Sequence, residues 1–146
     1  MFRGNHPARI DDKGRLKVPS EFKKVIDERY GSQFYITSVD GRVAQLYPFE
    51  EWERIEQKLA ALPTYNPTKK KFLSKVNYWG QMVEMDSQGR LLLPQLLRED
   101  ADLKGEVAVV GNLNLLEVRN LEKYRKEVVE EPFTSQDEET LNELGI

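Results

Sequence analysis

The apolar and polar positions follow the same order in the two halves of the chain. In each half, a short strand pattern leads into a tight turn, a second short strand and a short helix. These segments are residues 7–10, 11–14, 16–18 and 20–27 in the first half, and residues 81–85, 86–89, 91–93 and 95–101 in the second. The fourth residue of each turn is glycine, which readily takes a positive φ. Each helix follows a proline, which is favoured in a first helical turn.

A hairpin and an amphipathic helix complete each unit. The pattern predicts hairpin strands 33–37 with 43–47 and helix 49–62 in the first unit, and hairpin strands 106–110 with 115–119 and helix 121–130 in the second. The apolar faces of these helices are formed by Trp52, Ile55, Leu59 and Leu62, and by Leu121, Tyr124 and Val128. Between the units, Asn66-Pro67 predicts the start of a further helix that stops at Gly80. We expect the apolar faces to belong to the core.

One motif occurs twice. DDKGRLKVP runs from Asp11 to Pro19, and DSQGRLLLP runs from Asp86 to Pro94, 75 residues further on. Two short β-rich units cannot each bury much surface alone. We therefore expect them to pack about a pseudo-two-fold axis, so that the hairpins of each unit complete the sheet of the other. The prediction is an α+β fold, mainly β, in which the two Gly-Arg turns are symmetry mates.

The charge of the chain is unevenly distributed. The formal net charge is −3, but residues 1–24 carry an excess of four positive charges and residues 119–146 an excess of four negative charges. A second basic cluster consists of Lys69, Lys70, Lys71 and Lys75. Because the local field and not the net charge decides phosphate binding, a nucleic-acid partner is compatible with this sequence. The polar, acidic segment 131–146 is expected to be a mobile tail.

Several classes of function lack the residues they need. The chain has no cysteine, which excludes disulfides and thiolate metal sites, and His6 is its only histidine. The spacings of calcium loops, phosphate loops and dinucleotide sites are absent, and no nucleophile has an evident base partner. No apolar run approaches a membrane span or a secretory signal. We therefore expect no catalytic residue, cofactor, metal, small-molecule substrate or membrane contact, a cytoplasmic location, and an ordinary polar role for His6 at the start of a strand.

The arginine after each turn is the candidate contact residue. Arg15 and Arg90 stand where the chain leaves the turn. A guanidinium offers a planar fork of donors that suits phosphate oxygens or the O6/N7 edge of guanine, and a two-stranded ribbon fits the major groove of DNA. The structural alternative is that each arginine only pairs with the aspartate four residues earlier.

The neighbours of the two arginines differ. Lys13 and Lys17 are expected to flank Arg15 and to reach phosphates, whereas Gln88 and Leu92 take their places in the second copy. We therefore expect the first copy to supply more of any DNA contact, and Leu92 is open to a protein interface instead. The residues expected to shape the turns and orient the arginines are Asp11, Gly14, Asp86 and Gly89.

These residues resemble the MraZ family. The opening MFRG, the two copies of the motif, the stretch VEMDSQGRLLLPQLLRE and the stretch VAVVGNLNLLEV match it in order and spacing from Met1 to about Glu130. The resemblance implies two AbrB-like, swapped-hairpin domains at residues 5–50 and 81–124. It also implies a bacterial transcriptional regulator that binds short direct repeats in the promoter of its own division and cell wall operon.

The resemblance also implies site residues and partners. The Asp-x-x-x-Arg motif of the family maps onto Asp11 with Arg15 and Asp86 with Arg90. The implied partners are double-stranded DNA at the nucleoid and further copies of the chain in a ring-shaped, octamer-like homo-oligomer. The residues expected at the DNA are Arg15 and Arg90, supported by Lys13, Lys17 and Arg3.

One alternative function keeps the same fold. The chain could be a ring-forming scaffold or an antitoxin-like module, whose Arg turns dock a protein and not a specific DNA sequence. The two hypotheses differ in salt dependence, because each phosphate contact releases counterions when it forms.

Overall fold

The computed structural model describes residues 1–146. The first unit comprises β1 (Asn5–Ile10), β2 (Arg15–Lys17), α1 (Ser20–Arg29), β3 (Gln33–Thr37), β4 (Ala44–Pro48) and α2 (Phe49–Ala60), and α3 (Pro67–Tyr78) links it to the second. The second unit comprises β5 (Gln81–Glu84), β6 (Arg90–Leu92), α4 (Gln95–Asp100), β7 (Gly105–Asn112), β8 (Leu115–Asn120) and α5 (Leu121–Glu130), and α6 (Ser135–Glu143) follows it. The two units therefore share one order of elements, as the sequence predicts.

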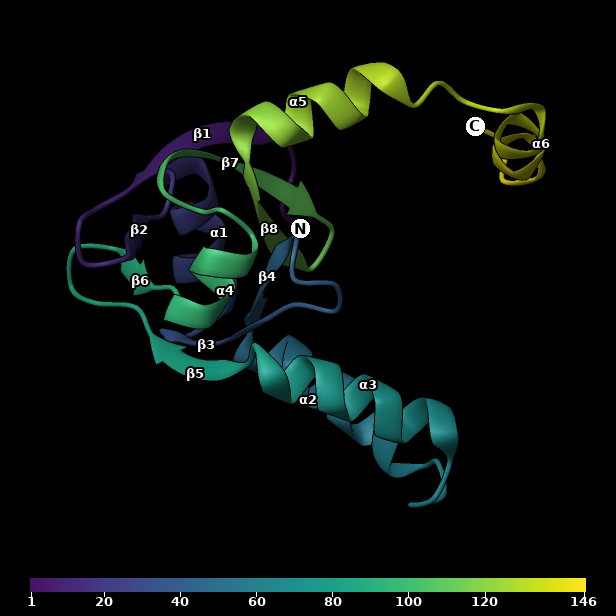
Figure 1. The fold of residues 1–146 in the computed structure, drawn as a ribbon, viewed down its shortest axis with the longest axis horizontal. Coiled ribbons are helices and arrows are strands. Elements are labelled where there is room, and N and C mark those ends of the chain that lie inside the picture. The colour runs from purple at the N-terminus through teal and green to yellow at the C-terminus, as the bar shows by residue number, and fades with distance from the viewer.

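All eight strands belong to one antiparallel sheet, in the order β5-β3-β4-β8-β7-β1-β2-β6. Four of its ladders join one unit to the other: β1 with β7, β2 with β6, β3 with β5, and β4 with β8. The two ends of the sheet also meet, because the backbone N–H of Asp86 donates to the carbonyl of Arg90 at 3.0 Å beside β5 and β6. The sheet is thus nearly closed, and the predicted α+β fold, mainly β, is confirmed (Figure 1).

The pairing register shows the pseudo-two-fold axis. In the β2–β6 ladder Leu16 lies opposite Leu91, its equivalent in the second copy of the motif. In the β4–β8 ladder Gln45 lies opposite Glu117, 72 residues further on. Each of these pairs joins equivalent positions of the two units, so the axis passes through the centre of both ladders.

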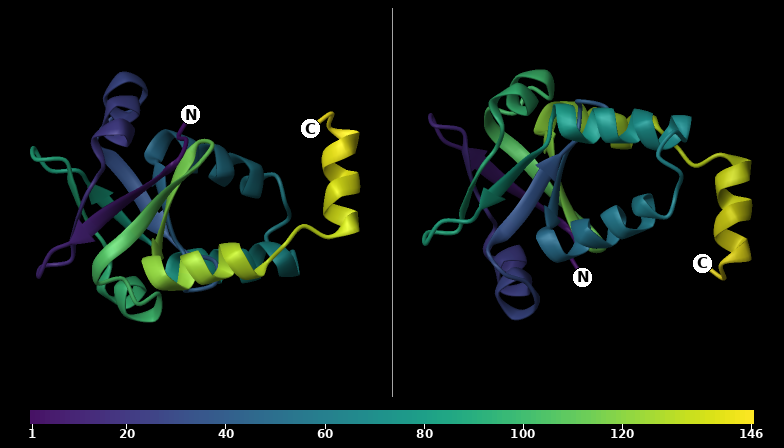
Figure 2. Two further views of the ribbon diagram at one scale, coloured as in Figure 1. Left: turned by 90° about the horizontal axis from the view of Figure 1, so that it is seen from above. Right: turned by 90° about the horizontal axis from the view of Figure 1, so that it is seen from below.

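The main core fills the inside of this sheet. Leu16 and Leu91 have no exposed surface and point inward from the two short strands β2 and β6. On opposite sides of the sheet, α1 contributes Phe22 and Ile26, and α4 contributes Leu97 (Figure 2). These helices begin directly after Pro19 and Pro94, which are their N-cap residues, so each proline separates a short strand from its covering helix.

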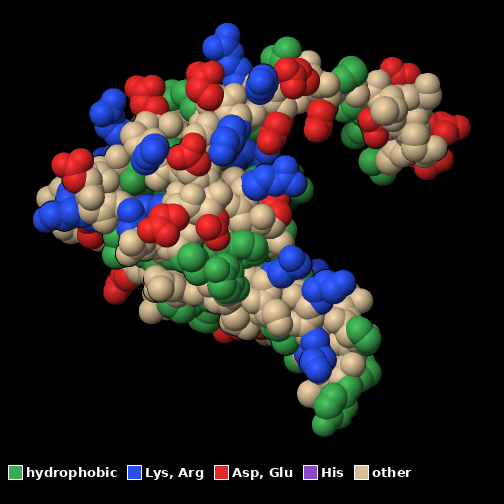
Figure 3. Space-filling model, in the orientation of Figure 1, with side chains coloured by type: hydrophobic (Ala, Val, Ile, Leu, Met, Phe, Trp, Pro, Cys, Tyr) green, Lys and Arg blue, Asp and Glu red, His purple; other side chains and the backbone are tan.

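Two helical arms project from the sheet and leave a hollow between them (Figure 3). The lower arm is α2 with α3. It is anchored by the stacked rings of Tyr35 and Trp52, whose centroids lie 4.5 Å apart. The hydroxyls of Tyr35 and Thr37 both donate to the backbone carbonyl of Val76, at 2.9 and 2.6 Å. The upper arm is α5, which buries none of its residues.

The helices differ from the sequence predictions in two places. Leu62 and Val128, expected in the core, are 41% and 58% exposed, because α2 ends at Ala60 and α5 stands away from the sheet. The segment expected to be a mobile tail contains α6, whose N-terminus is closed by a capping box between Thr134 and Asp137. No helix is long and apolar enough to span a bilayer.

Candidate nucleic-acid interface

The first Gly-Arg turn is organised by the carboxylate of Asp11. One of its oxygens accepts the backbone N–H groups of Lys13 at 3.0 Å and Arg15 at 2.9 Å. The other accepts the side-chain Nε of Arg15 at 2.8 Å. Gly14 completes the turn at a φ of +85°, in the region that glycine takes without strain. A single carboxylate thus fixes both the turn and the guanidinium that follows it.

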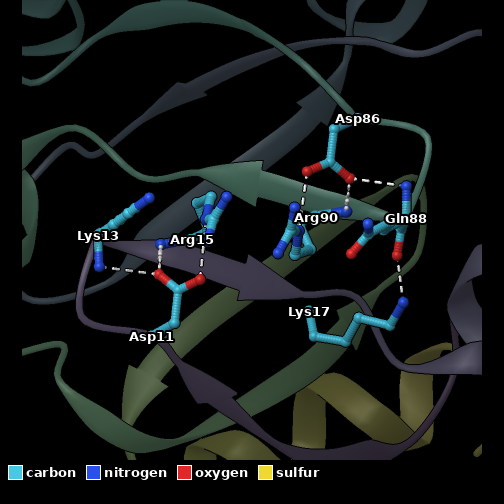
Figure 4. Close-up of polar contacts among 7 residues, drawn as sticks. All are labelled: Asp11, Lys13, Arg15, Lys17, Asp86, Gln88 and Arg90. Carbon is cyan, nitrogen blue, oxygen red and sulfur yellow. Dashed lines mark hydrogen bonds and ion pairs between the residues drawn. The ribbon is translucent and has the colours of Figure 1, made fainter.

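The second turn repeats this arrangement (Figure 4). Asp86 accepts the backbone N–H groups of Gln88 and Arg90, each at 2.9 Å, and the Nε of Arg90 at 2.8 Å. Gly89 has a φ of +74°. The turn-shaping roles expected for Asp and Gly therefore have a geometric basis in both copies.

Each arginine keeps free donors although it is paired. The ion pair uses only Nε, and no hydrogen bond or salt bridge within the chain uses the two terminal nitrogens of Arg15 or Arg90. The two side chains are 30% and 26% exposed. The pairing with aspartate that the structural alternative requires is thus present. It leaves the two terminal nitrogens of each guanidinium free to bind a ligand.

The hydrogen bonds also keep the carboxylates charged. The pKa of Asp11 is held below its usual value of 3.8, first by the backbone N–H of Arg15 and then by its side chain. The pKa of Asp86 is lowered in the same way by Arg90. At neutral pH both carboxylates are ionised, so they hold the two guanidinium groups in place.

The β2–β6 ladder brings the two turns onto one ribbon face. Leu16 and Leu91 point into the core, so their neighbours on each strand point outward. In this register Arg15 lies opposite Leu92, which is 50% exposed, and Arg90 lies opposite Lys17. We call the outward face made by these four residues the ribbon face.

Lys17 belongs to the second turn and not to the first. Its Nζ donates to the backbone carbonyl of Gln88, and its Cα is paired with that of Arg90. Lys17 lies two residues from Arg15 on the same outward side of β2, as expected, but its side chain reaches across the ladder to the second turn, a contact that the sequence did not predict. Lys13 stays within the first turn, so each arginine has one lysine near it and the two lysines lie at opposite ends of the ribbon (Figure 4).

Each turn is covered by a basic side chain from the other unit, which sequence reasoning missed. A Cβ on Gly14 would lie 2.4 Å from Cζ of Arg98 in α4, and one on Gly89 would lie 2.9 Å from Cδ of Lys23 in α1. The Nε of Arg98 donates to the carbonyl of Leu93 at 2.9 Å. Arg98 and Lys23 stand 75 residues apart, the same offset as the motif, so aligning the two units would have found them.

Comparison with known proteins decides the family. The model of the family described as "MraZ protein, putative antitoxin-like" matches residues 1–75 and 80–144, which cover both units. The chain belongs to the MraZ family.

Two MraZ relatives match over the whole chain. The proteins named Transcriptional regulator MraZ from Acidobacterium capsulatum and Koribacter versatilis are each 60% identical and are covered completely. The relative of that name from Haemophilus influenzae is 33% identical over 90% of this chain and 87% of its own length. These names describe transcriptional regulators and not enzymes, which agrees with the expectation that the chain is not an enzyme.

Arg3 stands apart from the other residues expected at the DNA in this MraZ chain. It precedes β1, next to Phe2, which is buried and bridges to Leu113. The six residues of β1 separate it from the first turn by about 20 Å. The structure therefore brings together Arg15, Arg90, Lys13 and Lys17, but not Arg3.

Proposed function

We propose that the chain is a transcriptional regulator that binds double-stranded DNA through its ribbon face. The observation that carries the proposal is the pair of guanidinium groups, each held by an aspartate through Nε and each with free terminal nitrogens, on one exposed two-stranded ribbon. The name of its MraZ relatives supports a role in transcription. Residues 5–50 and 81–124 are the proposed AbrB-like domains, which share the single sheet.

The proposed contacts divide into base readout and phosphate binding. Two terminal nitrogens of one guanidinium match the O6/N7 pair of a guanine in the major groove, and such a contact is worth about 1–3 kcal/mol of discrimination. Lys13 and Lys17 would bind phosphates on either side, since they lie at opposite ends of the ribbon. The aspartates position the arginines and do not contact DNA.

The ribbon face is not symmetric, which favours sites that all point the same way. The pseudo-two-fold relates Lys17 to Leu92 and Lys13 to Gln88, so the end beside the first turn has an exposed apolar side chain, Leu92, that the other end lacks. An exposed leucine side chain can contact the methyl group of thymine. A ribbon with unlike ends distinguishes the two directions of a site, which supports short direct repeats over palindromes.

Several copies would act together. One ribbon makes few contacts, whereas copies held in a ring-shaped homo-oligomer would meet tandem repeats with a high effective concentration. The proposed site is the promoter of the protein's own division and cell wall operon. The protein would act in the cytoplasm, at the nucleoid.

Fluorescence anisotropy with DNA from upstream of the reading frame tests the proposal. The wild type, Arg15→Ala, Arg90→Ala and the control Arg125→Ala, which alters an exposed arginine on α5, are titrated at two salt concentrations against promoter and scrambled DNA. We expect each ribbon variant to bind the promoter about 5–150-fold more weakly, and the control to bind like the wild type. Unchanged promoter binding by folded Arg15→Ala and Arg90→Ala would refute the proposal.

A protein-docking role is the second candidate. It is favoured by the antitoxin-like description of the family and by the exposed Leu92 on the ribbon face. In that case promoter and scrambled DNA would bind equally weakly and without the steep salt dependence of phosphate contacts.

A further inference from the structure

The outward side of α3 is a basic surface without partners. The side chains of Lys70, Lys71 and Lys75 make no hydrogen bond or ion pair within the chain, and no acidic residue occurs between residues 63 and 80. Lys69 is different, because its Nζ donates to the carbonyl of Leu62, in the loop after α2, at 3.0 Å. Tyr78 continues the exposed surface toward the sheet. The lysines are visible along the lower arm in Figure 3.

The opposite charge is carried by α6. Every residue of this helix except Leu141 is exposed, and the carboxylates of Glu138, Glu139 and Glu143 have no cationic partner. A helix of nine residues is marginal by itself in water, and the like charges of Glu139 and Glu143 four residues apart weaken it further. This helix is therefore stabilised most by a surface that is basic and partly apolar.

We propose that α6 of one copy packs against the outward side of α3 in a second copy. Lys70, Lys71 and Lys75 would face the glutamates of α6, and the exposed side chains of Leu144 and Tyr78 would meet beside them. The charges are complementary, three lysines without internal partners against three glutamates without internal partners. Where the packed helices exclude water, each Lys–Glu ion pair is stronger than an isolated ion pair on an exposed surface.

The geometry points to a second copy and not to the same chain. The short segment 131–134 joins α6 to the end of α5, and α6 lies beyond the arms, away from its own α3 (Figures 1 and 2). A contact between α6 of one copy and α3 of the next uses two different surfaces. Such a heterologous contact continues from copy to copy and closes into a ring when the rotation permits. The inference thus rests on the proposed self-assembly and names the surfaces that would join neighbours.

The absence of native cysteines allows a direct crosslinking test. Purified Lys75→Cys and Glu139→Cys chains are mixed and oxidised, and one of them has a tag so that a heterodimer differs in size from either homodimer. We expect a disulfide-linked heterodimer, at several times the yield from Glu139→Cys mixed with the control Lys104→Cys. Equal yields would overturn the contact. A Lys75→Cys/Glu139→Cys double variant that crosslinks only within single chains at every protein concentration would overturn the second-copy assignment.

Charge reversal gives an independent measurement by light scattering at fixed protein concentration. Lys71→Glu/Lys75→Glu should weaken self-association about tenfold or more, and so should Glu139→Lys/Glu143→Lys, because each converts two attractions into repulsions. Mixing the two variants should restore association, and Lys24→Glu/Lys104→Glu should leave it unchanged. Full association by both charge-reversed variants would overturn the α6–α3 contact while leaving the proposed assembly intact. A wild type that stays monomeric would overturn both, whereas loss of DNA binding with crosslinking retained would refute only the proposed DNA function.

Discussion

The two turn glycines occupy equivalent positions but should not tolerate alanine equally. Gly14 and Gly89 have φ values of +85° and +74°, so alanine at either costs about 1–2 kcal/mol of backbone strain. At Gly14 the new methyl group would also lie 2.4 Å from Cζ and 2.5 Å from Nε of Arg98. That guanidinium would have to leave, and its hydrogen bond to the carbonyl of Leu93 would be lost at a further cost of about 1–2 kcal/mol.

The side chain that a methyl group on Gly89 would meet can move away more easily than Arg98 can at Gly14. The nearest atoms are Cδ and Cε of Lys23, both at 2.9 Å, in the flexible part of a side chain whose exposed pair with Asp27 contributes little. We therefore expect Gly14→Ala to lower the free energy of unfolding by about 3 kcal/mol and Gly89→Ala by about 1.5 kcal/mol.

Urea unfolding at one fixed protein concentration measures the difference, and the thermal midpoints should differ by about 2–4 °C per kcal/mol. The variant Arg98→Ala provides the control, since Gly14→Ala introduced into that background should cost no more than Gly89→Ala does in the wild type. Equal losses for the two glycine variants, or no relief in the Arg98→Ala background, would refute the reasoning that Arg98 covers the first turn.

Three further outcomes follow from described contacts. An NMR titration should place the pKa of Asp11 below 3.8. The stability that this carboxylate contributes is then present above pH 3.8 and is lost as the pH falls through the lowered pKa. Arg15→Ala should raise the pKa only part of the way back to 3.8, because the hydrogen bond from the backbone N–H of residue 15 remains. Thr37→Val should cost about 1 kcal/mol in urea unfolding, since the carbonyl of Val76 loses one of its two donors. Leu92→Lys should steepen the dependence of log DNA affinity on log salt concentration by about 0.9. It should also reduce the preference for direct over inverted repeats. An unchanged slope would contradict the placement of the ribbon face at the DNA.

The sequence predicted the turns well because their cause is local. The aspartate of each motif accepts its hydrogen bonds from residues no more than four positions further along the chain, so the motif contains most of its own explanation. The duplication then predicted the pseudo-two-fold packing. The contact of Lys17 with the second turn was missed because it depends on the register between β2 and β6, and a pattern within one unit says nothing about the residue across the ladder.

The ends of the helices show a different limit. Pro63 could have predicted that α2 ends early, because the residue before a proline disfavours the helical conformation. Similarly, Thr134 three residues before Asp137 is a readable capping signal, and it would have added α6 to the prediction for the acidic tail. The exposure of Val128 had no signal within the sequence, because it depends on α5 leaving the sheet.

The interleaving of the two units governs how the chain can be made. Four of the seven strand ladders join residues from different halves, so a ribosome that has released only the first half has released strands without most of their partners. Folding must wait for β5 to β8, and pairing between such distant segments is slow. Two nascent first halves on neighbouring ribosomes offer each other nearly the same ladders that the second half would supply. The nearly closed sheet of the finished protein therefore implies an interval during synthesis in which the first-half strands lack their partners and can pair with another chain.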